Sequence, residues 1–345
     1  MKALRFYGSK DLRVEDVAAP KMCGPRQVIV KVAWCGICGT DLHEYLVGPI
    51  FIPRQQILGH EFSGIIVEVG SELKDLREGD RVAIQPLLTP GDDYYSVRGL
   101  GHLSEQRAFV GIRNWAWGGM AEYALLNDYN VAKLPDSVSD EQGALIEPAA
   151  VAVYAVDNSG LKAGNTVLIS GVGPIGALTV LAVSAMGASQ IFVAEPNSGR
   201  RKLIESWELC SGVFDPATED VPTRIREQTT VGVDVAIECV GNENSLDACL
   251  QSVRRQGTVV QVGLATSACK VDLQRLVIKS VTLRGSFCYP VYSWSRVIGL
   301  VAGGKLPIEK AVSSRVSLDA AVSQGFEVLT APGTDRLKVL IQLAD

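Results

Sequence analysis

The chain has 345 residues, and at roughly 100 to 200 residues per domain this length predicts two domains and excludes a single small module. Hydrophobic residues make up 47% of the chain and charged residues 21%, which excludes a disordered polymer and a collagen-like fibre. The formal net charge is −5, and no basic run of five or more residues occurs, so nucleic acid and anionic membranes are excluded as expected partners.

The N-terminal segment carries charges at Lys2, Arg5 and Lys10, where a secretory signal would need an apolar run. We therefore expect a cytoplasmic protein. The uncharged segment 163–194 is long enough to span a bilayer, but glycines and Pro174 interrupt it and favour a buried strand, a turn and a helix. The cysteines are scattered along the chain and are predicted to be reduced thiols rather than a disulfide framework. They are Cys23, Cys35, Cys38, Cys210, Cys239, Cys249, Cys269 and Cys288.

The first 150 or so residues are predicted to form a barrel-like β domain. Short runs with strand composition are separated by Gly, Pro and Asp, and they cover residues 27–34, 62–70, 81–86 and 120–126. At Ser139 the pattern changes to helix formers, which continue to Gly160. Pro148 lies within this helix and is expected to kink or break it. A domain boundary is therefore expected near this segment.

From Thr166 onward, strands and helices alternate. Strands are predicted at 166–170, 190–195, 233–240 and 257–264, and helices at 174–187, around 199–207 and after Asn242. This alternation is typical of an α/β domain with a doubly wound parallel sheet. After about Pro290 the pattern is mixed, and a terminal strand is predicted at 336–343.

A glycine-rich motif follows the strand at 166–170. Gly171, Gly173 and Gly176, with Pro174 and Ile175 between them, match G-x-G-x-x-G, a pattern that lets a backbone turn approach a pyrophosphate at the N-terminus of a helix. Glu195 follows about 20 residues later, where its carboxylate is placed to accept the adenosine ribose hydroxyls and to repel a 2′-phosphate. We therefore predict NAD rather than NADP, although Arg200 and Arg201 would attract that phosphate. A glycine turn without a cofactor is the alternative.

Candidate metal ligands lie in the first domain. Cys38, His60 and Glu61 supply soft, borderline and hard donors that suit zinc, and Glu147 offers a further carboxylate. Two alternatives stay open: a redox pair formed by Cys35 and Cys38, and a buried structural histidine followed by a surface glutamate.

Five motifs occur in a fixed order, namely GICGTDLH (36–43), GHE (59–61), GDRV (79–82), EQGALIEP (141–148) and GVGPIG (171–176). With them the chain resembles the zinc-dependent medium-chain alcohol dehydrogenases over essentially its whole length, and within that family the butanediol and sorbitol dehydrogenases most. The resemblance implies a GroES-like catalytic domain formed by residues 1–152 and 291–345. It also implies a Rossmann NAD-binding domain at 153–290, and a homodimer or homotetramer.

The resemblance also implies roles for individual residues. Cys38, His60 and Glu61 match the catalytic zinc ligands, and Glu147 matches the carboxylate that binds the zinc or exchanges with its water. Thr40 matches the hydroxyl that accepts the substrate proton, and His43 matches the relay of that proton to solvent. Arg200 falls where related sorbitol dehydrogenases contact the coenzyme.

The chain departs from the family pattern at several places. No cysteine occurs between Gly39 and Leu209, so the structural zinc of many relatives is expected to be absent and one zinc per subunit is predicted. The lobe at 86–119 instead carries aromatic residues that either pack as a substitute core or shape the substrate entrance; they are Tyr94, Tyr95, Trp115 and Trp117. The segment 53–60 is shorter than in typical butanediol dehydrogenases. Residues 285–289 lack the arginine of the sorbitol enzymes, which weakens polyol recognition.

The expected function is NAD-dependent interconversion of a small secondary alcohol or vicinal diol with its ketone, and 2,3-butanediol and acetoin are the best single substrates. The alternatives are a sugar-alcohol or threonine-type dehydrogenase, and a dehydrogenase of bulkier secondary alcohols. A zinc-free reductase or a non-catalytic ligand-binding relative represents a different class. Large, mostly apolar residues near the motifs are the candidates for the substrate pocket; they are Tyr45, Ile50, Trp115, Trp117, Phe287 and Tyr289.

Overall fold

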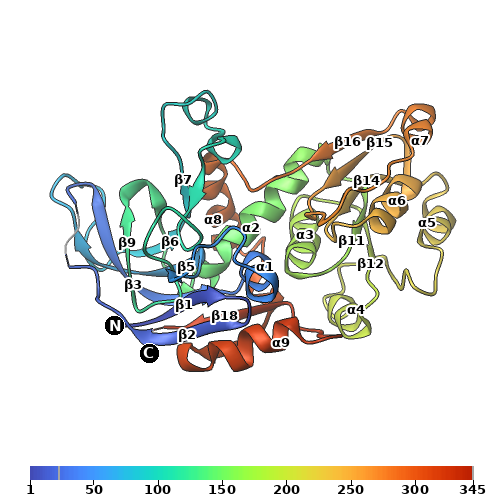
Figure 1. The fold of residues 1–345 in the computed structure, drawn as a ribbon. Helices are drawn as coiled ribbons and strands as arrows, with labels where there is room; N and C mark the ends of the chain where they lie inside the picture. The colour runs from blue at the N-terminus through green and yellow to red at the C-terminus, as the bar shows by residue number, and fades with distance from the viewer. Residues whose placement is uncertain (22–23, 344–345) are drawn as a thin grey trace. The chain divides into compact units, whose positions relative to one another are not determined.

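The computed structural model describes residues 1–21 and 24–343, so Cys23 lies outside the described residues. The chain forms two compact units (Figure 1), one made of Met1–Glu147 and Pro290–Asp345 and the other of Pro148–Tyr289. The first division falls inside helix α2 (Asp140–Ser159), a few residues before the boundary that the sequence predicts. Helix α2 continues through Pro148, so of the kink or break that the sequence predicts at this proline, the break does not occur.

A seven-stranded sheet forms the centre of the first unit. Its strand order is β10-β6-β5-β3-β18-β17, and β9 also pairs with β3. The strands are β3 (Gln27–Gly36), β5 (Glu61–Val69), β6 (Arg81–Ile84), β9 (Tyr123–Asn127), β10 (Val131–Lys133), β17 (Val312–Ser317) and β18 (Lys338–Gln342). In β18, which confirms the predicted terminal strand, Leu340 lies opposite Gly36 of β3. The end of the chain is thereby brought beside the segment that leads to Cys38.

Smaller elements complete the first unit. A three-stranded sheet has the order β2-β1-β4, and β7 pairs with β8. These strands are β1 (Lys2–Gly8), β2 (Asp11–Asp16), β4 (Gln56–Ile57), β7 (Leu87–Leu88) and β8 (Ala108–Phe109). The helices are α1 (Gly39–Val47), the first residues of α2, α8 (Trp294–Ala302) and α9 (Glu327–Thr330), which follows the π-helical turn Ala321–Phe326. The sequence did not predict β1, β2 or α1, because charged residues dilute the apolar pattern of these short elements.

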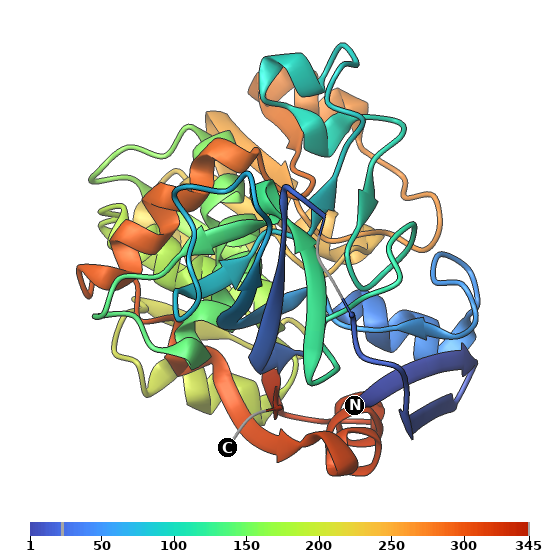
Figure 2. The same ribbon diagram turned by 90° about the vertical axis from the view of Figure 1, so that its left-hand side faces the viewer.

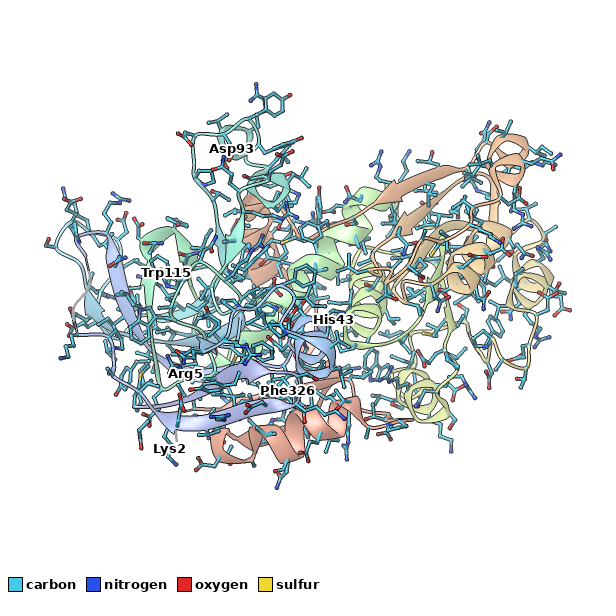
Figure 3. All side chains as sticks on the ribbon, viewed as in Figure 1. Lys2, Arg5, His43, Asp93, Trp115 and Phe326 are labelled. Atoms are coloured by element: carbon cyan, nitrogen blue, oxygen red, sulfur yellow. The ribbon has the colours of Figure 1, made fainter. Side chains whose placement is uncertain are left out.

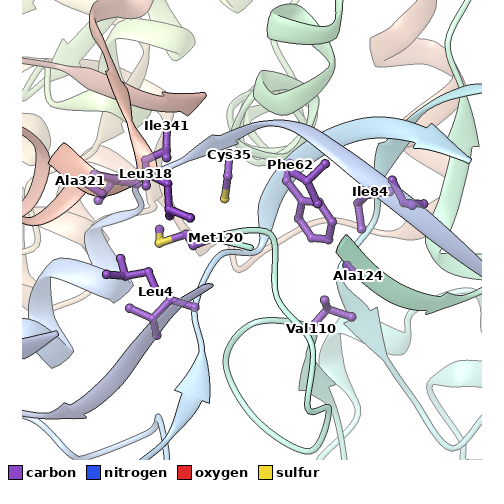
Figure 4. Packing of buried hydrophobic residues seen from close by; sticks show 14 of the residues in the cluster. Leu4, Cys35, Phe62, Ile84, Val110, Met120, Ala124, Leu318, Ala321 and Ile341 are labelled. Atoms are coloured by element: carbon purple, nitrogen blue, oxygen red, sulfur yellow. The ribbon is translucent and has the colours of Figure 1, made fainter. Parts of the chain in front are cut away.

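A large apolar cluster joins the sheets of the first unit. Figure 4 shows Cys35, Phe62 and Met120 within it, and all three side chains are fully buried. Burial of a large apolar side chain stabilises the fold by about 1.5–3 kcal/mol. Trp115 packs against the rim of the same cluster, and its indole N–H donates to the carbonyl of Leu125 at 2.7 Å. Trp115 therefore has the packing role that was one of its two predicted alternatives.

The second unit is a six-stranded sheet in which every neighbouring pair is parallel, in the order β13-β12-β11-β14-β15-β16. The strands are β11 (Thr166–Ser170), β12 (Gln190–Ala194), β13 (Gly212–Phe214), β14 (Val233–Glu238), β15 (Val253–Gln261) and β16 (Thr282–Gly285). The helices are α3 (Pro174–Ala185), α4 (Ser198–Glu205), α5 (Val221–Thr229), α6 (Glu243–Ser252) and α7 (Leu273–Lys279). The chain leaves β11 in one direction and returns on its other side at β14. Ligands of doubly wound sheets bind at such a reversal of strand order, beyond the carboxyl ends of the strands.

No helix in the described part of the chain is long and apolar enough to cross a membrane. The uncharged segment 163–194 instead contains β11, the 12-residue helix α3 and β12. This is the strand, turn and helix that its glycines and Pro174 predict.

Within the predicted lobe at 86–119, residues 89–107 project from the sheets of the first unit (Figure 2). Asp93, labelled in Figure 3, organises it by accepting hydrogen bonds from the backbone N–H groups of Tyr95 and Ser96 at 2.8 and 3.1 Å. Tyr94 is 66% exposed, and the guanidinium carbon of Arg98 lies over its ring, 3.9 Å from the ring centroid. Tyr94 is therefore a surface residue and does not form the substitute core that the sequence suggested.

The lobe instead buries His102, which lies in the short 3-10 helix Gly101–Leu103. Burial, together with the positive charge of Arg107, lowers the pKa of His102 to about 4. The unfolded chain binds a proton here near pH 6.5, so the unfolded state takes up the proton first as the pH falls. The stability contributed by neutral His102 is therefore present above pH 6.5 and is lost progressively between pH 6.5 and 4.

We expect His102→Leu to make the protein less sensitive to acid. Between pH 7 and 4.5 the free energy of unfolding should fall by about 2 to 3 kcal/mol less in this variant than in the wild type. Urea denaturation at the two pH values measures the difference. An equal loss of stability in both proteins would show that His102 does not titrate as its burial requires.

Candidate active site

Cys38 occupies the N-cap position of helix α1, where its backbone has extended geometry. Its backbone N–H donates to the carboxylate of Asp41 at 3.0 Å, which is the reciprocal half of a capping box. The Cys38 Sγ lies 3.9 Å from the hydroxyl oxygen of Thr40. The start of the helix therefore fixes the orientation of both side chains.

Glu61 begins strand β5 and His60 directly precedes it; they are 1% and 5% exposed. One potential ligand atom from each of Cys38, His60 and Glu61 lies within 4.8 Å of the others. Across residues 1–21 and 24–343 this is the one such group of three or more His, Cys, Asp or Glu side chains. The fold therefore brings together the three residues that the sequence identified as candidate ligands.

Glu61 also has a partner that the sequence did not reveal. The ammonium of Lys338, at the start of β18, donates to both Glu61 carboxylate oxygens at 2.8 and 2.6 Å and to the carbonyl of Ile37 at 3.0 Å. Both side chains are 1% exposed. A carboxylate with so little access to water needs an opposite charge nearby, and Lys338 supplies it.

The electrostatics of His60 show that this pocket favours a cation. Burial alone lowers the pKa of His60, but the negative charges of Cys38 and Asp41, with a contribution from Glu147, outweigh burial and raise it well above its usual value. His60 Nδ1 and Asp41 Oδ1 lie 3.8 Å apart, and neither has a hydrogen-bond partner among the described residues. A thiol, an imidazole and a carboxylate in a buried, negatively charged pocket are the donors that zinc prefers, so the residues fit this metal.

Thr40 and His43 lie three residues apart on helix α1 and therefore share one face of it. Both side chains are partly exposed, whereas Asp41, Glu44 and Tyr45 form the buried face. The ring of His43, labelled in Figure 3, lies 6.3 Å from the ring of Phe51. Glu147, on helix α2, is 7% exposed. The negative charge of Glu147 contributes to raising the pKa values of His60 and Lys338, so Glu147 lies near the group formed by Cys38, His60 and Glu61.

In the second unit, the glycine motif has the geometry that a dinucleotide requires. Gly171 has a φ of +85° and turns the chain out of β11. A Cβ on Gly176 would lie 1.9 Å from the Gly171 carbonyl oxygen, so only glycine allows helix α3 to approach the strand. A Cβ on Gly173 would meet no atom within 4 Å, which leaves open space at the helix N-terminus. Pro174 and Ile175 follow in the first turn of α3, and the arrangement fits a pyrophosphate there.

Glu195 lies directly after β12 and touches the glycine loop. Its carboxylate accepts the N–H groups of Val172 at 2.8 Å and Asn197 at 2.9 Å. The Arg200 N–H donates to the side chain of Asn197, the N-cap of α4, at 3.0 Å. Arg201 pairs with Asp215 at 3.0 Å and donates to the carbonyls of Glu195 and Pro196. Because Arg201 already has these acceptors, it is a weaker candidate for binding a 2′-phosphate than the sequence alone suggested.

A further buried carboxylate, which the sequence did not single out, ends strand β14. Glu238 is fully buried and accepts the N–H groups of Val240 and Gly241, the hydroxyl of Ser245 and the amide of Gln261. It therefore ties together the loops that follow β14 and β15, beside the reversal of strand order. The acidic end of an apolar strand was its only signal in the sequence.

Several candidates for the substrate pocket serve the core instead. Tyr45 is 6% exposed and packs against the ring of Phe326 at 5.5 Å between centroids, and Tyr289 is fully buried. Trp115 and Trp117 pack against the apolar cluster. Ile50 and Phe287 remain accessible, with 57% and 37% of their surface exposed.

Two family models match the chain. Residues 24–136 match the model described as the alcohol dehydrogenase GroES-like domain, and residues 174–303 match the model described as zinc-binding dehydrogenase. The first range lies within the β-rich first unit, and the second contains the whole parallel sheet of the second unit except the segment before residue 174, which includes β11, and ends in the part of the first unit that begins at Pro290.

Relatives cover the whole chain. The chain is 38% identical to the (R,R)-butanediol dehydrogenase of Bacillus subtilis, over 99% of both chains, and 33% identical to the sorbitol dehydrogenase of Ovis aries, over 99% of this chain and 96% of the relative. The crystal structure of 2R,3R-butanediol dehydrogenase from Bacillus subtilis superimposes with a TM-score of 0.92, at 38% identity and 99% coverage of both chains. A structure from Sinorhizobium meliloti 1021 assigned to the zinc-binding dehydrogenases, bound to NADP, gives 0.91 at 33% identity and covers 99% of this chain and 98% of its own. The chain therefore belongs to the zinc-dependent medium-chain alcohol dehydrogenases and is an oxidoreductase of that family.

Proposed function

We propose that this protein interconverts a small secondary alcohol or vicinal diol with the corresponding ketone, using one zinc ion and NAD, and that 2,3-butanediol and acetoin are its best substrates. The observation that carries the proposal is the buried group of Cys38, His60 and Glu61 in a chain that is 38% identical over its whole length to an (R,R)-butanediol dehydrogenase. The (R,R)-butanediol dehydrogenase of Neisseria gonorrhoeae, at 33% identity, supports the same substrate class.

Cys38, His60 and Glu61 are the proposed zinc ligands. When bound, zinc supplies Lewis-acid chemistry that makes the hydroxyl of an alcohol more acidic. Lys338 balances the charge of Glu61, and Asp41 fixes the N-terminus of α1 that carries Cys38. Glu147 lies close enough for its charge to affect the pKa of His60. We propose that it is the further carboxylate, which either takes the ligand position of Glu61 or exchanges with a water molecule on the zinc. A single zinc per chain is proposed, since no second cluster of cysteines follows strand β6 in the sequence.

Thr40 and His43 are the proposed proton path. The Thr40 hydroxyl lies 3.9 Å from the Cys38 Sγ, so it is close to where a substrate hydroxyl would be held. His43 is one turn further along the same face of α1 and is partly exposed. An imidazole can both accept and donate a proton, so a histidine with access to water can carry a proton to solvent. We propose that Thr40 accepts the hydroxyl proton and that His43 passes it to solvent.

NAD is the proposed coenzyme. Gly171, Gly173 and Gly176 provide the pyrophosphate turn, with Pro174 and Ile175 at the helix start, and Arg200 is proposed to contact the adenosine. Glu195 is 4% exposed, so a 2′-phosphate beside its carboxylate would meet like-charge repulsion with little screening by water. NADP binding by the Sinorhizobium relative makes a direct comparison of the two coenzymes necessary.

We expect the wild type to prefer NAD over NADP in kcat/KM, and Glu195→Ser to lower that preference by about 10- to 100-fold. Rates with NAD should also fall in this variant, because Val172 loses its hydrogen-bond acceptor. The quantity to compare is therefore the ratio of kcat/KM with NAD to kcat/KM with NADP. Glu205→Ser, at the exposed end of α4, is the matched control and should leave the ratio unchanged. A wild type that prefers NADP would mean that Arg200 and Arg201 determine the choice.

A substrate panel tests the proposed reaction. NAD reduction would be measured with the stereoisomers of 2,3-butanediol, simple and bulky secondary alcohols, sorbitol, xylitol and threonine. We expect kcat/KM to be highest for a butanediol isomer. A higher value for sorbitol would favour the sugar-alcohol activity that the 33% identity to sorbitol dehydrogenases makes the second candidate. No turnover with any substrate, in zinc-loaded protein, would favour a binding protein that has lost catalysis.

We also propose a homo-oligomer, either a dimer or a tetramer. Strand β16 ends its sheet and, among the described strands, pairs only with β15. Leu283 on this edge is 37% exposed, and Leu273 and Val277 on the neighbouring helix α7 are 68% and 77% exposed. An open strand edge with apolar neighbours suits pairing with a second copy. Light scattering at the mass of one 36.9 kDa chain would contradict this proposal.

The cytoplasmic location expected from the sequence stays a proposal. The described cysteines are free thiols; they are Cys35, Cys38, Cys210, Cys239, Cys249, Cys269 and Cys288. Free thiols in a large chain are typical of a reducing compartment.

A further inference from the structure

A loop formed by residues 48–53 is held against helix α1 by one buried carboxylate. Glu44 is fully buried, and its two carboxylate oxygens accept the N–H groups of Ile50 and Phe51, both at 2.8 Å. A carboxylate that accepts two backbone N–H groups makes strong, charge-assisted hydrogen bonds. The Gly48 N–H donates to the Glu44 carbonyl at 2.8 Å, and a Cβ on Gly48 would lie 2.4 Å from the carboxylate. Glycine at this position therefore lets the 48–53 loop close on Glu44.

The far end of the 48–53 loop is anchored as well. Ile52 is 1% exposed and belongs to the apolar cluster, and the N–H of Gln55 donates to the carbonyl of Phe6 at 2.6 Å. Between these anchors, Ile50 and Phe51 are 57% and 54% exposed. The backbone on both sides therefore holds two adjacent large apolar side chains in contact with water. Such an exposed apolar pair is expected at a site where a ligand covers it.

Phe51 lies next to the proposed proton path. Its ring centroid is 6.3 Å from that of His43, with 33° between the ring planes. His43 shares its helix face with Thr40, whose hydroxyl lies 3.9 Å from the Cys38 sulfur. The exposed ring of Phe51 is therefore placed on the side of the helix where the substrate hydroxyl would release its proton.

We propose that Phe51 is a specificity-determining residue that forms an apolar wall beside the carbon chain of the substrate, and that Glu44 is the positioning residue that holds this wall in place. This inference rests on the proposed function, because it assigns the wall to an alcohol site. An apolar ring offers no hydrogen bond to additional hydroxyl groups. A fixed ring also limits the length of the chain on that side. Phe51 thus favours a short diol over a polyol or a long secondary alcohol.

Three variants test the proposal in the zinc-loaded, full-length protein: Phe51→Ala, Glu44→Gln and the double variant. The readout is the ratio of kcat/KM for 2,3-butanediol to that for 2-octanol. We expect Phe51→Ala to lower this ratio about tenfold or more, with kcat for 2,3-butanediol within about threefold of wild type and KM raised. Glu44→Gln retains one acceptor and loses the other, so its ratio should shift in the same direction by less.

The double variant separates positioning from a general loss of structure. If Glu44 acts through Phe51, the double variant should shift the ratio no further than Phe51→Ala alone. Val97→Ala, which trims a side chain of similar exposure at 62% in the lobe, is the control and should leave the ratio unchanged. Melting temperatures of all variants show whether they fold. If Glu44→Gln does not fold, the result for Phe51→Ala alone decides the test.

Three results would overturn the inference. A ratio within twofold of wild type in Phe51→Ala, or additive effects in the double variant, would remove it and leave the proposed function intact. A wild type that binds zinc and NAD but oxidises neither alcohol would overturn the proposed function and this inference together.

Discussion

Replacing Cys38 by Ala is expected to remove the zinc and to reduce turnover at least a thousandfold. Cys38 supplies the thiolate of the buried group, and without it His60 and Glu61 remain as two protein donors near Glu147. A metal that activates the reacting oxygen contributes several kcal/mol to the transition state, which corresponds to about a thousandfold in rate. His60→Ala should have the same effect. Glu61→Ala should retain residual activity, because Glu147 or water takes its place.

The neighbouring thiol provides the control. Cys35 is fully buried in the apolar cluster, and burial raises its pKa well above the usual value for a thiol. Cys35→Ala should therefore keep its zinc and its turnover and lose about 1–2 kcal/mol of stability through the cavity it leaves. Elemental analysis and NADH formation measure both variants. Wild-type rates in Cys38→Ala would remove the metal mechanism, and loss of turnover with zinc retained in Cys35→Ala would favour the redox-pair alternative.

Replacing Lys338 by Met is expected to lower the free energy of unfolding of the zinc-depleted protein by about 3–5 kcal/mol. The substitution leaves the Glu61 carboxylate, 1% exposed, without its cation, and a buried charge that loses its partner is strongly destabilising. Urea denaturation measures the change. Adding zinc should reduce the deficit, because a bound cation again balances Glu61.

Two further variants distinguish the lost pair from the lost side chain. Lys338→Met combined with Glu61→Gln removes both charges and should recover most of the stability. Lys2→Met breaks the ion pair with Asp319, in which the side chains are 50% and 64% exposed, and should leave the denaturation midpoint nearly unchanged. If the double variant is as unstable as Lys338→Met, the loss comes from packing rather than from the unpaired carboxylate.

The elements and residues that the sequence predicted correctly are those with local signals. Strand β11 and helix α3 were predicted within two residues at each end, because an apolar run, three glycines and Pro174 follow one another directly. The parallel sheet follows from the same alternation of strands and helices. The candidate ligands Cys38, His60 and Glu61 were also recognised from short motifs, and the fold brings them together.

The residues that the sequence did not reveal depend on contacts between distant segments. Lys338 lies 277 positions from Glu61, and a lysine at the start of an apolar strand carries no sign of its partner. Tyr45 was assigned to the substrate pocket because it follows the ligand motif closely, yet the turn of helix α1 directs it to Phe326 and the core. Glu44 is the neighbour of Tyr45 in the sequence, where nothing distinguishes it from a surface charge. Only the folded 48–53 loop supplies the two backbone N–H groups that bind its carboxylate.

A zinc titration of zinc-depleted protein, followed by NADH formation from 2,3-butanediol and NAD, tests the single catalytic zinc most directly. If Cys38, His60 and Glu61 hold a single catalytic zinc, the rate should rise in proportion to added zinc and stop at one equivalent per 36.9 kDa chain. The unloaded protein should be inactive. Full activity without zinc, or a rate that reaches its maximum only at two equivalents, would contradict a single catalytic zinc at this site.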